Sequence, residues 1–190
     1  NITNHIWNDH NGGVEMVSST VKFFIASGLG VFLLASSPVW ALKVGDTAVN
    51  IKVRDANDKA ASIPDLGKKV LALFYTDPDV KDQNEPFRNM MKAAKLDKSK
   101  YRGLGIVNLK DTWKPNFLIR KIIRGKIEKF KSVILTDPGH LLKNKWKLGD
   151  CNEKDVVIII GKDAKVKYIK KSALNKNEMK KTLGLIKELM

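Results

Sequence analysis

The chain has 190 residues, of which 43% are hydrophobic and 29% charged, and its formal net charge is +15. This length and composition suit one globular domain with a sizeable core, and they exclude wholesale disorder. The basic excess favours anionic partners such as nucleic acid, acidic lipid or acidic protein. However, the lysines are scattered and arginines are few, which is unlike a dedicated nucleic-acid-binding protein. A soluble domain of lysine-rich composition explains the charge as simply.

Residues 16–41 have the pattern of a secretory signal peptide. A 12-residue apolar run at 23–34 follows Lys22, and Val39 and Ala41 stand at the −3 and −1 positions of a cleavage site. The alternative is an uncleaved anchor helix, although the run is shorter than the ~20 residues that a membrane span requires. We therefore expect cleavage after Ala41.

Residues 1–15 do not fit this plan, because the chain starts with Asn1 and a natural start stands at Met16. We interpret them as an artefact of an over-extended gene start. The mature chain then has one cysteine, Cys151, and one histidine, His140, so it can form no internal disulfide, Cys-x-x-Cys motif or zinc cluster. We expect no cofactor and no metal. Residues 42–190 carry 34 basic and 18 acidic residues, a net charge of +16.

The first part of the mature chain predicts three strands and a helix. Alternating apolar residues indicate a half-buried strand at 48–54, which pairs with 60–63 as an amino-terminal β-hairpin. The continuous apolar run 70–75 predicts a strand buried on both faces. A polar loop at 76–82 then leads to a helix at 82–95, where apolar residues recur with helical spacing.

The second part continues the alternation and ends in an antiparallel hairpin and a helix. We expect strands at 104–108, 132–136, 156–160 and 165–170, helices at 117–130 and 175–190, and a connection at 141–148. Asn175 and Glu178 have the spacing of a capping box. Strands separated by helices must be parallel with right-handed crossovers. The prediction is a single α/β domain over 42–190, with a central mixed sheet flanked by helices.

This order of elements is similar to the thioredoxin fold in its peroxiredoxin-like form. From about residue 104 onward the motifs also resemble the YtfJ family of exported thioredoxin-fold proteins. These motifs are 106–108, 133–138, 146–148, 156–159 with Lys162 and Asp163, and 173–178. The resemblance covers most of 42–190. It implies an exported, periplasmic protein of poorly defined biochemical role.

The chain departs from the wider fold where thioredoxins carry Cys-x-x-Cys. The loop after strand 70–75 runs from Thr76 to Asp82 without a cysteine, and Asp155 stands where a proline usually precedes the next hairpin strand. Thiol exchange and peroxide reduction by the usual route both require a thiolate. We therefore expect neither at this loop.

Thr76, Asp77, Asp79 and Asp82 remain candidates for a binding site in this loop. Their oxygen atoms suit a hard cation, but they lack the ligand number and the glycine of a calcium loop. The alternative is that these carboxylates cap the following helix and interact with its dipole.

Cys151 is a weak catalytic candidate that could form a mixed disulfide with a partner. Its polar neighbours, Asp150 and Asn152, predict an exposed side chain, while nearby acidic groups argue against a lowered thiol pKa. His140 follows a Pro-Gly turn, and we expect it to be a solvated surface histidine.

The helix at 117–130 carries a basic side that could bind anions, unless it is simply a solvated helix face. Trp113 and Trp146 would provide stacking beside it if they are not packed in the core. The anion-binding candidates are Arg120, Lys121, Arg124 and Lys129, with Lys143, Lys145 and Lys147 beyond them.

The sequence as a whole predicts a redox-inactive, exported thioredoxin-fold protein that acts by binding an unknown protein partner in the cell envelope. We also expect weak anion binding, and no membrane span once the signal peptide has been cleaved. The alternative is a thiol-dependent oxidoreductase or peroxiredoxin-like protein that acts through Cys151 alone.

Overall fold

The computed structural model describes residues 41–190. The predicted gene-start artefact at 1–15 and the predicted signal peptide at 16–41 lie outside the described residues, apart from Ala41. Within 41–190, none of the helices combines the length and apolar character needed to cross a bilayer.

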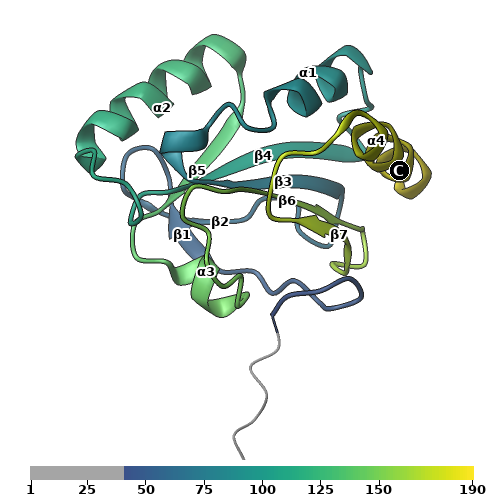
Figure 1. Cartoon of the computed structure of the whole chain (residues 1–190), viewed down its shortest axis with the longest axis horizontal. Helices are drawn as coiled ribbons and strands as arrows, with labels where there is room; N and C mark the ends of the chain where they lie inside the picture. Colours follow the sequence, from purple (N-terminus) through teal and green to yellow (C-terminus); the bar gives the residue numbers. More distant parts are fainter. Residues whose placement is uncertain (1–40) are drawn as a thin grey trace, which may run out of the picture. The chain divides into compact units, whose positions relative to one another are not determined.

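The centre of the domain is a mixed sheet in the order β2-β1-β5-β4-β3-β6-β7 (Figure 1). β3, β4 and β5 are parallel, while β6 is antiparallel to β3 and β1 is antiparallel to β5. This arrangement confirms the predicted mixed sheet with hairpins at its edges. The strands are β1 (Lys52–Arg54), β2 (Ala60–Ser62), β3 (Val70–Thr76), β4 (Tyr101–Asn108), β5 (Val133–Asp137), β6 (Asp155–Ile160) and β7 (Val166–Lys170).

Helices cover both faces of the sheet: α1, α2 and α4 lie on one face and the short α3 lies on the other (Figure 1). Alternate residues of β3 point to opposite faces. Val70, Ala72 and Phe74 therefore pack with α1 and α4, while Leu71, Leu73 and Tyr75 pack on the side of α3. The helices are η1 (Pro78–Val80, a 3-10 turn), α1 (Glu85–Ala93), α2 (Asn116–Phe130), α3 (Leu141–Lys145) and α4 (Lys176–Leu189).

Two elements differ from the sequence prediction. The first strand is limited to β1, because the chain before it pairs elsewhere: Thr47 bridges Lys165, and the Ala48 amide donates to the Ala164 carbonyl at 2.8 Å. The predicted connection at 141–148 contains α3. The Asp137 carboxylate accepts hydrogen bonds from the first amides of α3, which lets this short helix form without an apolar repeat of its own.

Candidate functional site

The carboxyl ends of β3, β4 and β5 form the polar edge where this class of sheet places binding sites. These strands end in Thr76, Asn108 and Asp137. The register pairs Asn108 with Asp137 and pairs Thr76 with Asp155 at the start of β6. Four polar side chains from distant parts of the sequence thus occupy one edge of the sheet.

Asp77 fixes the loop after β3. Its side chain is buried, and its two oxygens accept hydrogen bonds from the amides of Asp79 at 2.9 Å and Glu153 at 2.8 Å. It is therefore the N-cap of the short η1. A carboxylate engaged in this way has little capacity left for a ligand. The helix-capping alternative concerned the longer helix that follows, and the N-cap of that helix, α1, is instead Asn84, which provides no side-chain cap.

The other two carboxylates of the loop turn toward different lysines. Asp79 pairs with Lys114 and accepts a hydrogen bond from Thr112 at 3.0 Å, and the Lys114 ammonium lowers the pKa of Asp79. Asp82 pairs with the exposed Lys81 at 2.6 Å. The predicted loop carboxylates thus do not converge on one point. Within residues 41–190, no group of three or more acidic, histidine or cysteine side chains could hold a metal ion.

Asp155 and Arg88 form a buried ion pair at this edge. Arg88 Nη2 lies 2.7 Å from Asp155 Oδ2, and the Thr76 hydroxyl donates to Asp155 Oδ1 at 2.6 Å. Burial raises the pKa of Asp155, against the opposing effect of Arg88 and its hydrogen bonds. The guanidinium also lies over the Phe74 ring, 4.2 Å from its centroid. These contacts link Thr76, at the start of the loop where thioredoxins carry Cys-x-x-Cys, to α1 and to the start of β6.

A second polar cluster joins the loop after β4 to the start of α3. Asp111 accepts a hydrogen bond from Lys143 Nζ at 3.1 Å and another from Asn108 Nδ2 at 2.5 Å, and its Oδ1 lies 2.8 Å from His140 Nε2. Burial favours the neutral acid, but these hydrogen bonds and charges lower the pKa of Asp111 overall. His140 is only 18% exposed, so the prediction of a solvated surface histidine is wrong. The carboxylate of Asp111 holds it in place.

Beneath this cluster, Tyr75 and Asp137 are fully buried. The Tyr75 hydroxyl donates to Asp137 Oδ2 at 3.1 Å. Burial, followed by the negative charge of Asp137, raises the pKa of Tyr75. The tyrosine therefore remains a neutral hydrogen-bond donor that helps to anchor the start of α3.

The prediction that Cys151 is exposed is wrong. The residue is buried in the main core cluster, with Sγ 4.0 Å from the Leu148 carbonyl. Burial raises the pKa of its thiol, despite the nearby charges of Lys143 and Lys171. The sequence neighbours of Cys151 are polar, but the chain turns at 151–154, so that the cysteine points inward while Asp150 and Asn152 remain exposed.

The predicted basic surface is divided in the structure. Arg120 pairs with Asp58 at 2.6 Å, and Arg124 donates to the Ala56 carbonyl at 2.9 Å, so both arginines contact the turn between β1 and β2. Lys121 and Lys129 remain exposed on α2. α3 lies across the sheet from α2 (Figure 1). Lys143 and Lys145 belong to α3 and Lys147 follows it, so the prediction that these three residues extend the same surface is wrong.

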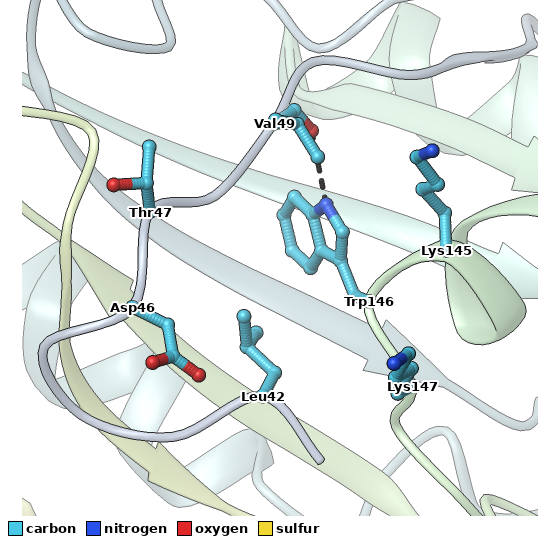
Figure 2. A pocket seen from close by; sticks show the side chains of 7 residues that line it. All are labelled: Leu42, Asp46, Thr47, Val49, Lys145, Trp146 and Lys147. Atoms are coloured by element: carbon cyan, nitrogen blue, oxygen red, sulfur yellow. Dashed lines mark hydrogen bonds between the residues drawn. The ribbon is translucent and has the colours of Figure 1, made fainter. Parts of the chain in front are cut away.

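A shallow cavity of about 320 Å³ lies beside α3 (Figure 2). The Trp146 indole forms part of its wall, and its N–H donates to the Val49 carbonyl at 2.9 Å (Figure 2). Trp146 is therefore a packed core residue, as the alternative reading predicted, and not a stacking platform beside α2. The residues that line the cavity are Leu42, Asp46, Thr47, Val49, Lys145, Trp146 and Lys147.

Sequence reasoning missed Arg88, Asp111 and Asp137, and it noticed Asp155 only as a missing proline. It named Lys143 only as part of a basic surface, and not as the partner of Asp111. One signal was available: three successive predicted strands end in polar residues, and parallel strands bring their carboxyl ends to one edge. No local pattern indicates which of these groups contact each other. Arg88 and Asp155, for example, are 67 residues apart.

Comparison with known proteins identifies relatives by sequence. The family model described as "Bacterial protein of unknown function (YtfJ_HI0045)" matches residues 48–189. A Haemophilus influenzae protein described as uncharacterized is 28% identical over 112 residues, which cover 57% of this chain and 59% of the relative. That match therefore spans less than two thirds of the length of the relative.

Two solved structures are similar in fold. A candidate protein disulfide isomerase from Bacteroides thetaiotaomicron has a TM-score of 0.59 at 19% identity, covering 78% of this chain and 90% of that one. A peroxiredoxin-like protein from Aquifex aeolicus has a TM-score of 0.55 at 17% identity, covering 80% and 90% respectively. At these identities the likeness concerns the fold alone, and it confirms the predicted thioredoxin-like architecture.

Proposed function

The chain belongs to the family of bacterial proteins whose model matches residues 48–189, and we propose that it is an exported, redox-inactive thioredoxin-fold protein that binds a protein partner in the cell envelope. Membership confirms the resemblance seen in the sequence motifs. The solved structures of similar fold include proteins whose descriptions refer to thiol chemistry. The proposal therefore depends on which residues this chain has in place of their thiols.

The observation that carries the proposal is the composition of the edge at the end of β3. Thr76, Arg88 and Asp155 fill it with mutually satisfied hydrogen bonds and charges. A thiolate is the reactive species in disulfide exchange. The single cysteine is buried elsewhere, and its raised pKa keeps it a neutral thiol at physiological pH. These features also oppose the alternative of an oxidoreductase that acts through Cys151.

Activity assays test the redox-inactive part directly. We expect neither insulin reduction nor peroxide consumption above the buffer rate, for the wild type and for Cys151→Ser alike. Any turnover that disappears in Cys151→Ser would overturn the proposal in favour of the oxidoreductase.

The binding part is tested at the loop after β3, where the Asp79–Lys114 pair is partly exposed. We expect a crosslinked partner from the native envelope to be lost from Asp79→Ala/Lys114→Ala. The matched control is Asp163→Ala/Lys167→Ala, a comparable ion pair beyond the other end of β6. A partner that is retained by the first variant, or lost equally from both, would contradict a binding role for this loop.

Export is tested on the amino terminus. The signal-peptide pattern of 16–41 supports it, and intact-mass analysis of the exported form should find Leu42 as the first residue. Expression from Met16 should be sufficient. A retained 23–34 segment in the mature protein would indicate the membrane-anchored alternative.

A further inference from the structure

The outer side of α2 exposes an unusual concentration of large apolar side chains. Within residues 41–190, eight large hydrophobic residues are exposed, and five of them lie between 113 and 130. Trp113 is 84% exposed and Phe117 is 73% exposed. Isolated exposed apolar residues are common, but a concentrated patch marks an interaction site. We define the apolar patch as Trp113, Phe117, Leu118, Ile122 and Phe130.

The apolar patch is not needed to attach α2 to the sheet. Ile119 and Ile123 are buried under the helix, with Ile127 packed partly beside them. This spacing of four residues forms the inner stripe of a surface helix. Phe117, Leu118 and Ile122 lie outside that stripe, so they contribute exposed apolar area and little packing.

Basic side chains accompany the apolar patch. The stretch 113–131 contains seven basic residues and one acidic residue, Glu128. Lys121 and Lys129 are exposed on the helix, and Lys129 Nζ lies 5.3 Å from the centre of the Phe130 ring. Lys92 of α1 approaches the same ring at 5.8 Å. An apolar surface surrounded by cations complements an anionic, partly apolar partner.

We propose that the outer side of α2 binds the surface of a membrane that contains anionic phospholipid. The apolar patch enters the region between headgroups and acyl chains, and the lysines contact phosphate groups, as in interfacial amphipathic helices. The net charge of +16 for residues 42–190 draws the whole domain toward such a surface. This inference is independent of the proposed protein partner.

The arrangement of the patch favours a membrane over an acidic protein. Its members extend along the whole of α2, which at 15 residues is about 22 Å long, from Trp113 before the helix to Phe130 at its end. Protein interfaces concentrate their energy in a central, well-packed group of anchors. Exposed apolar side chains spread along the length of one helix instead suit a planar, deformable surface.

Cosedimentation with lipid vesicles tests this inference on the full chain. We expect binding to vesicles of equal parts phosphatidylglycerol and phosphatidylcholine, weaker binding to phosphatidylcholine alone, and weakening by salt. Phe117→Ser/Ile122→Ser should lower the partition coefficient at least about tenfold, because two exposed apolar anchors are lost. Lys121→Gln/Lys129→Gln should weaken binding to the anionic vesicles only.

The matched control is Val44→Ser/Leu141→Ser, which removes two other exposed apolar side chains; Leu141 lies in α3, across the sheet from α2. All variants share residues 1–40, so membrane binding by the apolar run 23–34 cancels in the comparison. Trp113 supplies a local probe. Subtracting the fluorescence emission of Trp113→Phe from that of the wild type gives the emission of Trp113, which should shift to shorter wavelength on binding.

Three outcomes would overturn the inference. The first is that, at low salt, the wild type binds the anionic vesicles no more strongly than Phe117→Ser/Ile122→Ser does. The second is an equal loss of binding in the control variant, and the third is an unshifted Trp113 spectrum in a bound protein. Capture of an acidic protein by the wild type, lost in Phe117→Ser/Ile122→Ser with no vesicle binding, would assign the patch to a protein partner instead.

Discussion

At the scale of single residues, the most consequential contact is the ion pair between Asp155 and Arg88. The Asp155 side chain is completely buried, while the Arg88 side chain is 30% exposed and its guanidinium packs against Phe74. Burying a carboxylate is costly unless it is paired and hydrogen-bonded, and Thr76 and Arg88 meet that need. The pair joins α1 to the start of β6 and fixes the loop between β3 and α1.

Replacing Arg88 should therefore destabilise the domain strongly. Arg88→Met leaves a buried carboxylate without its cation, and we expect the free energy of unfolding to fall by about 3 kcal/mol. The double variant Arg88→Met/Asp155→Asn should recover at least about 1 kcal/mol of this loss, because the uncompensated charge is gone. Urea unfolding followed by circular dichroism measures both.

The exposed pair of Lys81 and Asp82 provides the control. Lys81→Met should change stability by less than about 0.5 kcal/mol, since exposed ion pairs contribute little. A comparable loss in both single variants, or no recovery in the double variant, would contradict a special role for the buried pair.

At the scale of elements, polar contacts decide where helices begin and how loops are held. Asn175 and Glu178 form the predicted capping box at the start of α4, with the Glu178 amide donating to Asn175 Oδ1 at 2.9 Å. α2 begins without a side-chain cap. The loops at the polar edge are held by Asp111, which contacts Asn108, His140 and Lys143.

One substitution measures how much the capping box contributes to stability. Asn175→Ala removes the acceptor for the Glu178 amide, and we expect a loss of about 1 kcal/mol in unfolding free energy. Asn116→Ala is the matched control, because Asn116 is the first residue of α2 and provides no side-chain cap there. Equal effects of the two substitutions in thermal unfolding would refute the assignment.

Asp111 should give the stability of the polar edge a defined pH dependence. Its folded pKa is lower than the ordinary value of 3.8, so its contribution is present above about pH 4 and is lost as the pH falls through the folded pKa. Asp111→Asn should thus cost about 1–2 kcal/mol near pH 7, from lost charge-assisted hydrogen bonds, and the difference should shrink in acid.

Two further variants complete the pH experiment. Repeating it in a His140→Gln background removes the neighbouring imidazole, which faces Asp111 together with Asn108 and Lys143. Asp82→Asn, at an exposed site, should produce a smaller change at neutral pH. A difference between wild type and Asp111→Asn that grows in acid would reverse the expected sign.

At the scale of the whole molecule, basic residues far outnumber acidic ones. Residues 42–190 carry a net charge of +16, and this excess makes the folded state repel itself at low ionic strength. Some of the surface cations are paired, as Arg120 and Lys114 are, but most of the excess remains available to solvent and to anionic partners.

Salt should consequently stabilise the fold. Between about 10 mM and about 150 mM potassium chloride, screening of like charges should raise the melting temperature by roughly 3 °C. Calorimetry in chloride and fluoride at equal ionic strength should give the same rise. A falling melting temperature would mean that the ion pairs outweigh the general repulsion, and dependence on the identity of the anion would indicate a specific site.

The sequence alone determined the order of the strands and of the longer helices, the doubly buried β3 and the capping box of α4, because each is encoded by local spacing of apolar and polar residues. It did not indicate α3, which depends on the buried Asp137. It also determined that the edge after β3 has no thiol. Tertiary structure decided which side chains meet there. Arg88 and Asp155 are 67 residues apart, and Tyr75 and Asp137 are 62 apart, so no periodicity could predict either pair. Burial of Cys151 and attachment of Arg120 to the first hairpin likewise depend on how distant segments pack. Local patterns thus specify the scaffold. Long-range packing decides which polar groups are buried and paired inside it, and it leaves the outer side of α2 exposed.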